Sequence, residues 1–364
     1  MPPSAYRRGS CVQGLFEQRG HTVQASRVAG IGNVESVVCF DEVVSPDFEE
    51  VSALMRANWT PPCWVYERDL LTMHILRPTA DPSMAVGLRA TNGDLASYLA
   101  FVPLRLRVGG RVYRAVFGSF FTVSGRYRRH RLSDRQQGLM LDRARDQGYE
   151  LYVAVTVAGT PANQTVARAF AARGLTVQSV RNFRYLAGVP AIISTRLGPG
   201  DPGRVRCYEP ADAPAAFTLL SACTAQALLA KVVEREDIDF LLRLRPRVTT
   251  YVYEAHGEVL GLVSLSFLPV LSERVGMNAY VEAFAVIRLE PTARVAFVDT
   301  VLRAALAQGA EAVMVPDTGC ADLDVFRRLG FRAAPRKLRL LLGALRPDIT
   351  GLPEAVDRFC LDVF

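Results

Sequence analysis

The sequence lacks any long hydrophobic run and any recognisable export signal. No apolar stretch reaches the roughly 18 residues that a membrane-spanning helix needs, and the opening MPPSAYRRGS is not followed by an apolar h-region. We therefore expect a cytoplasmic protein without a membrane span. Half of the residues are hydrophobic, which is typical of a compact globular chain.

Lysine is nearly absent. Lys231 and Lys337 are the only lysines among 43 lysine and arginine residues, a skew that is typical of GC-rich coding sequence. The net charge of +7 is therefore weak evidence for nucleic-acid binding, since the chain has no lysine-rich tail and no basic repeat interleaved with aromatic residues. We expect no nucleic-acid partner, and the charge remains compatible with an anionic substrate.

Paired cysteines are also absent, because the seven cysteines lie far apart and form no C-x-x-C motif. An odd and scattered set argues against a disulfide framework and against a structural zinc site. We expect free thiols in the core or at the surface, and no metal.

The length of 364 residues exceeds the usual size of one hydrophobic core and predicts two domains. We expect a weakly defined arm over residues 1–44 and a first domain over 45–196. A linker with the sequence LGPGDPG occupies residues 197–203, and a second domain covers 204–364.

Periodicity and turn signals indicate the elements of both domains. An amphipathic helix follows Pro46, with Phe48, Val51, Leu54 and Met55 on one face. Tight hairpins are predicted at Asn92-Gly93, Gly109-Gly110 and His256-Gly257. The order helix pair, antiparallel strands, helix, strand, helix, strand then occurs twice along the chain.

The two halves differ at one connection. In the first half, an apolar strand passes into Arg126, Arg128, Arg129, His130 and Arg131 before a helix begins. A helix N-terminus that follows a strand presents free backbone N–H groups and the positive end of the helix dipole, which bind phosphate, and arginines add charge-assisted hydrogen bonds. The second half reads RLEPTARV here, so we expect one active site; a solvated basic loop is the alternative.

This loop is followed by a helix, a strand and the pattern N-x-x-x-A-x-x-F-x-x-x-G-L from Asn163 to Leu175, an order that resembles the GNAT superfamily of N-acetyltransferases. In that superfamily a loop of pattern R/Q-x-x-G-x-G/A grips the pyrophosphate of coenzyme A. Here Arg128–Ser133 occupy it, with Arg131 where glycine is usual. That variant is similar to the loop of protein N-myristoyltransferases, which consist of two such domains in tandem.

The likeness to the myristoyltransferases continues in order from about residue 45 to the end. Short stretches carry it: Val86–Arg89, Phe101–Pro103, VTVAG at Val155–Gly159, TYVYEAHGEVLGLVSLSFLP, NAYVEAFAV and VFRRLGF. The resemblance implies an α+β fold of two tandem GNAT-like domains, each a mixed, mostly antiparallel sheet flanked by helices. It also implies a monomeric acyltransferase whose second domain is degenerate for coenzyme A and contributes the acceptor site.

Two departures bear on the acceptor. The family's acidic loop, whose carboxylates recognise lysines of a protein substrate, is replaced near Asn58 by NWTPPC, and Val157 replaces a threonine. We infer a bacterial relative in secondary metabolism with a different acceptor. The expected reaction moves an acyl group, long-chain by the resemblance, from acyl-CoA or an acyl carrier protein to a primary amine of a small molecule or peptide.

The resemblance also assigns the site residues. Backbone N–H groups of Phe120 and Phe121 would form the oxyanion hole, and the terminal carboxylate of Phe364 would be the base, with Asp362 as the side-chain alternative. Desolvation raises the pKa of a carboxylate and makes it a better base. The expected acyl-CoA-binding residues are Phe121, Val123, Arg128, Arg129, His130, Arg131, Leu132, Ser133 and Asn163.

Several alternatives stay open at this stage. Asn163 caps its helix, touches the pantetheine arm, or does both, and His74 is a packed or surface histidine. Phe170 stands where many acetyltransferases carry an acidic tyrosine, and no Ser/His/Asp or Cys/His set is visible, so we expect direct attack without an acyl-enzyme. Acetyl transfer to an aminated metabolite and a non-catalytic thioester-binding module are the competing functions.

Overall fold

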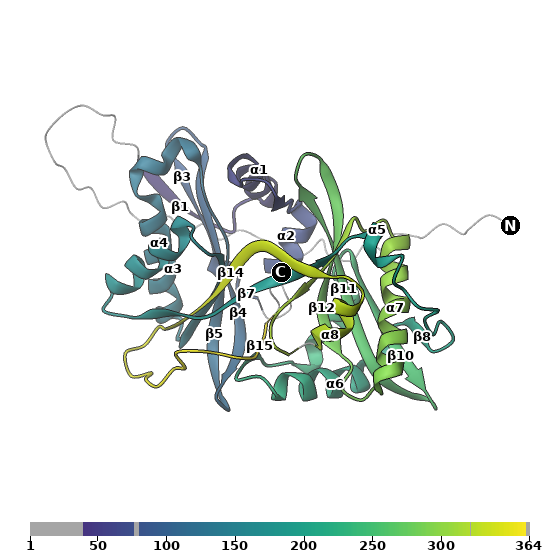
Figure 1. The fold of residues 1–364 in the computed structure, drawn as a ribbon. Coiled ribbons are helices and arrows are strands. Elements are labelled where there is room, and N and C mark those ends of the chain that lie inside the picture. Colours follow the sequence, from purple (N-terminus) through teal and green to yellow (C-terminus); the bar gives the residue numbers. More distant parts are fainter. Residues whose placement is uncertain (1–38, 76–79, 321, 362–364) are drawn as a thin grey trace, which may run out of the picture.

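The computed structural model describes residues 39–75, 80–320 and 322–361, and Figure 1 shows their arrangement. The first half contains β1 (Phe40–Val44), α1 (Phe48–Asn58), β2 (Cys63–Trp64), α2 (Arg68–Ile75), β3 (Ala85–Ala90), β4 (Leu95–Val108), β5 (Arg111–Val123), α3 (Leu132–Asp146), β6 (Leu151–Val157), α4 (Pro161–Ala171) and β7 (Val177–Gly188). The second half contains α5 (Pro190–Ile193), β8 (Val205–Cys207), α6 (Ala213–Ala225), β9 (Leu229–Lys231), β10 (Val248–Ala255), β11 (Glu258–Leu271), β12 (Val275–Ala285), α7 (Pro291–Ala307), β13 (Ala312–Pro316), α8 (Leu323–Arg328), β14 (Arg332–Ala344) and β15 (Phe359–Cys360). Short 3-10 turns and one π-helical turn (Phe240–Leu244) complete the described elements.

Local signals in the sequence specify α1 and the hairpins. The carboxylate of Asp47 accepts a hydrogen bond from the backbone N–H of Glu49 at 2.9 Å, which caps the helix. The predicted apolar face is confirmed, because its four members are buried: Phe48, Val51, Leu54 and Met55. The three hairpin turns are confirmed as well, and each uses glycine at a positive φ: Gly93, Gly110 and Gly257.

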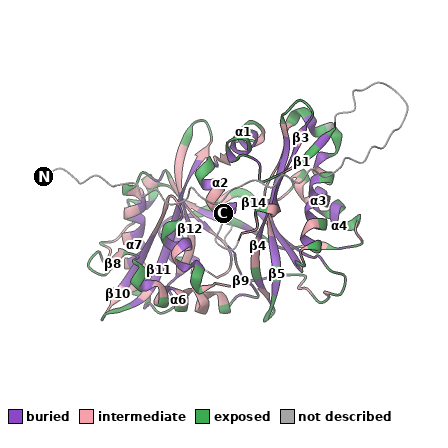
Figure 2. Ribbon diagram, turned by 180° about the vertical axis from the view of Figure 1, so that it is seen from behind, coloured by how far each residue is buried: buried purple, intermediate pink, exposed green. Residues whose placement is uncertain are grey.

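The described strands join in one 15-stranded sheet, whose main path runs β1-β3-β4-β5-β6-β14-β7-β13-β12-β11-β10-β8. Most neighbours are antiparallel, and β5–β6 and β12–β13 are parallel pairs at equivalent places in the two halves. The predicted mixed, mostly antiparallel sheet flanked by helices is confirmed. Figure 2 shows burial concentrated along the strands, with exposed residues on the outer helices and turns.

Strands of the two halves interleave at the centre of the sheet. β14 of the second half lies between β6 and β7 of the first half, and β7 pairs with β13 of the second half. Figure 1 shows β7 and β14 crossing the middle of the molecule. One buried cluster accordingly takes residues from both halves, including Val153, Phe183, Leu268 and Phe359. The expected linker is also packed, since the N–H of Gly198 donates to Asp299 at 2.7 Å.

Two stretches differ from the sequence-based expectation. Phe40–Val44, placed in the weakly defined arm, forms β1 and pairs with β3, while residues 1–38 of the arm lie outside the described residues. The sequence PADAPAAFTLLSACTAQALLA, residues 210–230, predicts a helix, but Leu229–Lys231 form β9, which pairs with both β4 and β15. Tertiary pairing overrides the helical pattern there, because an apolar run of this length fits either structure.

Candidate functional site

The parallel strands β5 and β6 separate before they end. Their pairing runs from Ala115↔Leu151 to Gly118↔Ala154, although the strands continue to Val123 and Val157. Both strands change from buried to mostly half-buried residues at that point. The two strands therefore diverge towards their ends, on the side where the chain continues into α3 and α4, and we call the region between these ends the opening.

A β-bulge distorts β5 at this opening. The register between β4 and β5 shifts between Tyr98 and Ala100, opposite Phe120 and Phe121, and Phe120 adopts a left-handed φ of 61°. A left-handed conformation costs a residue with a side chain about 1–2 kcal/mol. A bulge leaves backbone groups outside the regular ladder, and left-handed residues turn successive N–H groups toward one point. Phe120 and Phe121 accordingly have no partner in the β4–β5 register at the opening.

Aromatic side chains hold the bulge in place. The Phe120 ring packs edge-to-face on Tyr66, with 4.9 Å between the ring centroids, and also contacts His74. The hydroxyl of Thr122 donates to the carbonyl of Phe120 at 3.1 Å and accepts from the indole N–H of Trp59 at 2.8 Å. Burial raises the pKa of Tyr66, which keeps its phenol neutral. His74 is 3% exposed, which agrees with a packed histidine rather than a surface residue.

The basic loop follows β5 as a 3-10 helix, Gly125–His130, and α3 begins after it. Arg131 connects the two with a left-handed φ of 53°, so it adopts the conformation that makes glycine usual at this position. Its side chain is 84% exposed, and its guanidinium lies 3.5 Å from Asp134. Arg128 is exposed and bonded to no described residue. These charges are available to a ligand at the start of α3.

Other members of the loop anchor it. The phenol of Tyr127 is buried and donates to Asp94 at 2.8 Å, and Arg126 pairs with the same carboxylate at 2.8 Å. The hydrogen bond from Tyr127 is the main reason that the pKa of Asp94 is lowered. Asn58, at the end of α1, accepts from the N–H of Gly125 at 2.6 Å. Arg126 is thus a structural residue, in contrast to Arg128 and Arg131.

The remaining loop residues also include both exposed and buried side chains. The exposed imidazole of His130 contacts the ring of Phe40, with 5.6 Å between the centroids. Leu132 is buried and Ser133 is half-buried, so Leu132 offers a ligand its backbone alone. Arg129 lies within the 3-10 helix.

Asn163 lies within the first turn of α4, and the capping role is wrong. Thr160 is the N-cap residue, and no side chain caps this helix. The side chain of Asn163 instead binds the hydroxyl of Thr156 at 2.5 Å and the carbonyl of Val157 at 3.3 Å, at the end of β6. It therefore ties α4 to the edge of the opening. An ion pair of 2.8 Å between Arg168 and Asp134 joins α4 to α3.

The structure brings most of the predicted site residues together around the opening. Phe120, Phe121 and Val123 lie on β5, the basic loop lies at its end, and Asn163 lies at the end of β6. Phe364 and Asp362 fall outside the described residues. Phe170, which is fully buried and packs on Tyr152 with 5.4 Å between the centroids, is a core residue.

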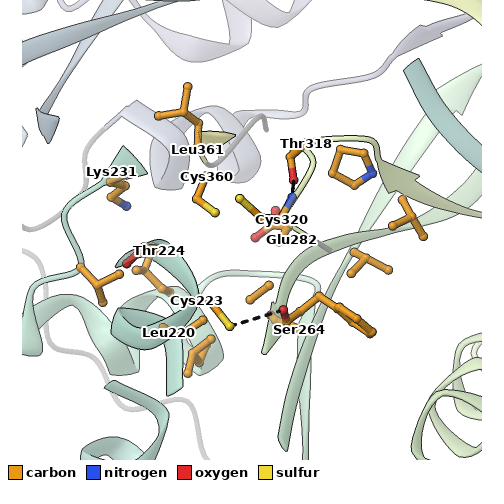
Figure 3. A pocket seen from close by; sticks show the side chains of 18 of the residues that line it. Leu220, Cys223, Thr224, Lys231, Ser264, Glu282, Thr318, Cys320, Cys360 and Leu361 are labelled. Carbon is orange, nitrogen blue, oxygen red and sulfur yellow. Dashed lines mark hydrogen bonds between the residues drawn. The ribbon is translucent and has the colours of Figure 1, made fainter. Parts of the chain in front are cut away.

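The second half repeats the separated strands and the bulge. β12 and β13 are parallel up to Tyr280↔Met314, and the register of β12 with β11 shifts at Glu282. The space beyond is a cavity of about 130 Å³, shown in Figure 3. Glu282 lines this cavity and forms a bidentate ion pair with Arg245 at 2.5 and 2.9 Å. Both side chains are less than a tenth exposed, at 7% and 4%.

Three of the scattered cysteines meet in this cavity. Figure 3 shows the sulfurs of Cys320 and Cys360 side by side, and the thiol of Cys223 lies 4.0 Å from the carbonyl of Phe284. Burial raises the pKa of Cys223 to about 11, and the hydrogen bond from Cys360 is the main reason that the pKa of Cys320 is lowered. The described cysteines are free, as expected, and Cys11 lies outside the described residues.

Sequence reasoning missed several of these features. Arg245 and Glu282 are 37 positions apart, and each looks like an ordinary surface charge in the sequence. The indole N–H of Trp64 donates to the phenol of Tyr280 at 2.7 Å, and nothing in the sequence pairs these two residues, which are 216 positions apart. Among the described residues, no cluster of three or more His, Cys, Asp or Glu is placed to bind a metal. No described helix is long and apolar enough to cross a membrane.

No protein-family model and no curated protein sequence matches the chain, whereas solved structures share its fold. N-myristoyltransferase from Saccharomyces cerevisiae with bound myristoyl-CoA has a TM-score of 0.70 at 15% identity, over 86% of this chain and 80% of that one. A second structure of that enzyme gives 0.70 at 14% identity, over 90% of both chains. A GCN5-related N-acetyltransferase from Kribbella flavida gives 0.53 at 16% identity, over 84% and 71%. The chain thus shares the fold of these N-myristoyltransferase and GCN5-related N-acetyltransferase structures.

Proposed function

We propose that the protein is an N-acyltransferase that transfers a long-chain acyl group from acyl-CoA to a primary amine by direct attack. The observation that carries the proposal is the opening between β5 and β6, which has a strained bulge at Phe120 on one side and a basic helix N-terminus beyond it. The fold supports it, and the higher similarity to structures solved with myristoyl-CoA favours a long acyl chain.

Different residues contact different parts of the acyl-CoA in this proposal. Arg128 and Arg131 bind the phosphates of coenzyme A together with the backbone N–H groups at the start of α3, and Arg129, His130 and Ser133 complete this site. The pantetheine arm lies along the edges of β5 and β6, past Val123, Thr156 and Asn163. The thioester carbonyl then faces the bulge at Phe120 and Phe121.

In the reaction, the amine nitrogen attacks the thioester carbonyl and a C–N bond forms. The developing oxyanion accepts hydrogen bonds from the backbone N–H groups of Phe120 and Phe121. The C–S bond breaks as the carbonyl re-forms, and the thiolate of coenzyme A leaves without a side-chain acid, since Phe170 stands at the tyrosine position. The proton of the amine passes to the base.

The base in this proposal is the carboxylate of Phe364, and Asp362 is the alternative. The described residues just before them, Phe359 and Leu361, belong to the buried cluster shared by both halves, against which Phe120 packs. Asp362→Asn separates the two possibilities, because it leaves the main-chain carboxylate intact. Retained turnover in this variant assigns the base to Phe364, and lost turnover assigns it to Asp362.

The function is tested by incubating the purified protein with acyl-CoAs of graded chain length and a panel of primary amines, while free thiol release and product mass are followed. We expect amine-dependent release that is fastest with a long chain. A preference for acetyl-CoA would assign acetyl transfer instead. Tight acyl-CoA binding without turnover on any amine would point to a non-catalytic module.

Removing either available arginine of the loop should weaken coenzyme A binding. We expect Arg128→Ala and Arg131→Ala each to cost about 1.5–3 kcal/mol, the value of a hydrogen bond to a charged group. Titration calorimetry with coenzyme A and with dephospho-coenzyme A measures this loss and identifies the phosphate concerned. Arg126→Ala is the matched control, since Arg126 already pairs with Asp94. Unchanged affinity in both variants would mean that the loop is a solvated basic loop and not a phosphate site.

The second half should bind no coenzyme A of its own. β12 ends at Ala285 and α7 begins at Pro291, so the connection is a short turn without the 3-10 helix and clustered arginines of the first half. Native mass spectrometry with excess coenzyme A should give one ligand per chain. Arg128→Ala should weaken the binding of this single ligand. A second bound coenzyme A of similar affinity would contradict this prediction.

A further inference from the structure

A groove with a strongly basic lining lies where β7, β14 and α8 meet. Its volume is about 460 Å³, and its charged lining residues are Arg184, Arg327, Arg332, Lys337 and one acid, Asp317. Asp317 is already paired with Arg181 at 3.5 Å. The sequence from Arg327 to Arg339 contributes Arg328, Arg336 and Arg339 as well, and contains no acidic residue.

These charges differ from those of many surface arginines in the described part of the chain. About half of the others lie against a carboxylate, as in Arg126–Asp94, Arg143–Glu42, Arg168–Asp134, Arg173–Asp142 and Arg346–Asp348. Arg184, Arg332 and Lys337 are exposed and form no ion pair with a described residue. Arg184 and Arg332 donate to the backbone carbonyls of Ala334 and Phe331.

The strand register also brings like charges together. Lys337 on β14 lies directly opposite Arg184 on β7. Like charges at directly opposed positions of a sheet destabilise it. The fold therefore carries a repulsive pair that a bound anion would relieve.

The groove adjoins the proposed reaction site. The carbonyl of Lys337 accepts a hydrogen bond from the N–H of Ala158 at 2.9 Å, and Leu338 is in register with Val157 at the end of β6. Burial raises the pKa of Cys63 and of Tyr280, and the nearby charge of Arg336 partly offsets both shifts. Arg336 thus lies near the aromatic residues that connect the two halves.

The groove lies on the side of the opening away from the basic loop. The loop continues from β5, whereas the groove flanks β6 through β14. In the proposed function the loop holds the donor, so the groove faces the acceptor side. A side that is positive and concave favours an acceptor with several negative charges.

We propose that Arg184, Arg332 and Lys337 bind the carboxylates of an acidic peptide that carries the acceptor amine. This inference rests on the proposed function. An acidic peptide matches the groove better than a folded carrier protein would. A carrier protein would deliver the acyl donor, and the donor phosphates already have a separate site at the basic loop. This recognition would be opposite in charge to that of the acidic loop of the myristoyltransferases, whose carboxylates recognise lysines of a protein substrate.

The test uses three synthetic peptides of equal length, each with an N-terminal amine and one lysine amine, in which the remaining variable positions are Glu, Gln or Arg. We expect wild-type protein to acylate the Glu peptide with a kcat/KM about two- to thirtyfold above that of the Gln peptide, the effect of two exposed ion pairs. The advantage should shrink as salt rises. Arg332→Glu combined with Lys337→Glu should remove the preference and leave the KM for acyl-CoA unchanged.

Two controls keep the result interpretable. Arg145→Glu reverses an exposed charge at the end of α3, away from the groove, and should leave the preference intact. Lys337→Glu alone places a carboxylate opposite Arg184, so its melting temperature should equal or exceed that of the wild type. Equal rates with the Glu and Gln peptides, or an unchanged preference in the double variant, would overturn the proposal.

Fluorescence anisotropy with a labelled Glu peptide separates this inference from the proposed function. Binding that the double variant loses, in the absence of turnover on any amine, would support the groove and reject the function. Absence of binding of the labelled Glu peptide to the wild-type protein would reject the groove as a site for acidic peptides. Binding of phosphatidylglycerol vesicles that the double variant loses, without any preference for the Glu peptide, would assign the surface to a membrane and overturn the proposal.

Discussion

Glu282→Ala is expected to lower the free energy of unfolding by about 3–5 kcal/mol, because it removes the carboxylate that offsets the buried charge of Arg245. The two side chains are 7% and 4% exposed and share two hydrogen bonds. The hydroxyl of Ser266 donates to the same carboxylate at 2.5 Å and would lose this acceptor too. Urea denaturation followed by circular dichroism measures the change.

The matched variant replaces both charges at once. Arg245→Met combined with Glu282→Leu keeps the volume and removes the pair, so its stability should lie near that of the wild type or above it. Asp348→Ala removes an exposed partner of Arg346 and should change stability by less than about 1 kcal/mol. A loss below about 1 kcal/mol in Glu282→Ala would mean that water reaches the pair.

This ion pair also explains how the two halves diverge. The bulge that carries Phe120 in the first half corresponds to the bulge that carries Glu282 in the second. In the first half the space beyond the bulge opens toward a basic helix N-terminus. In the second half it is a cavity that contains Arg245, Glu282 and three thiols. The same backbone geometry thus supports a ligand opening in one half and a buried ion pair in the other.

The sequence predicted the parts of the fold that depend on local physics. Gly93, Gly110 and Gly257 mark turns because positive φ excludes most other residues, and the spacing of Phe48, Val51 and Leu54 identifies the buried face of α1. The interleaving of β7 and β14 follows no local signal. It depends on pairing between strands that are far apart in the sequence.

The candidate site was predictable to a similar degree. The basic loop is contiguous in sequence, so its place between a strand and a helix could be inferred, but its division into anchoring and available arginines could not. That division depends on Asp94, which lies on a separate hairpin. Cys223, Cys320 and Cys360 looked scattered because they come from α6, a loop and β15. Asn163 looked like a cap because asparagine is common at the start of a helix. Its actual bond to Thr156 crosses from helix to strand and has no local sequence signal.

Removing the backbone N–H of Phe121 should lower kcat by about 10²–10³, the usual cost of losing one oxyanion donor. The change is made by incorporating the α-hydroxy analogue of phenylalanine at position 121, which replaces one amide with an ester and keeps the side chain. The KM for acyl-CoA should stay nearly constant, because the hydrogen bond strengthens only as charge develops on the carbonyl oxygen.

Esters at neighbouring positions make the assignment specific. An ester at position 120 tests the second proposed donor, whereas an ester at Val116, within the paired part of β5 and β6, should reduce stability but not kcat. The left-handed φ of 61° at Phe120 gives the reason to expect an effect at 121, because this turn moves the following N–H out of the ladder direction. Wild-type kcat in the esters at both 120 and 121 would show that the oxyanion is stabilised elsewhere, and the strain at Phe120 would then need a structural explanation.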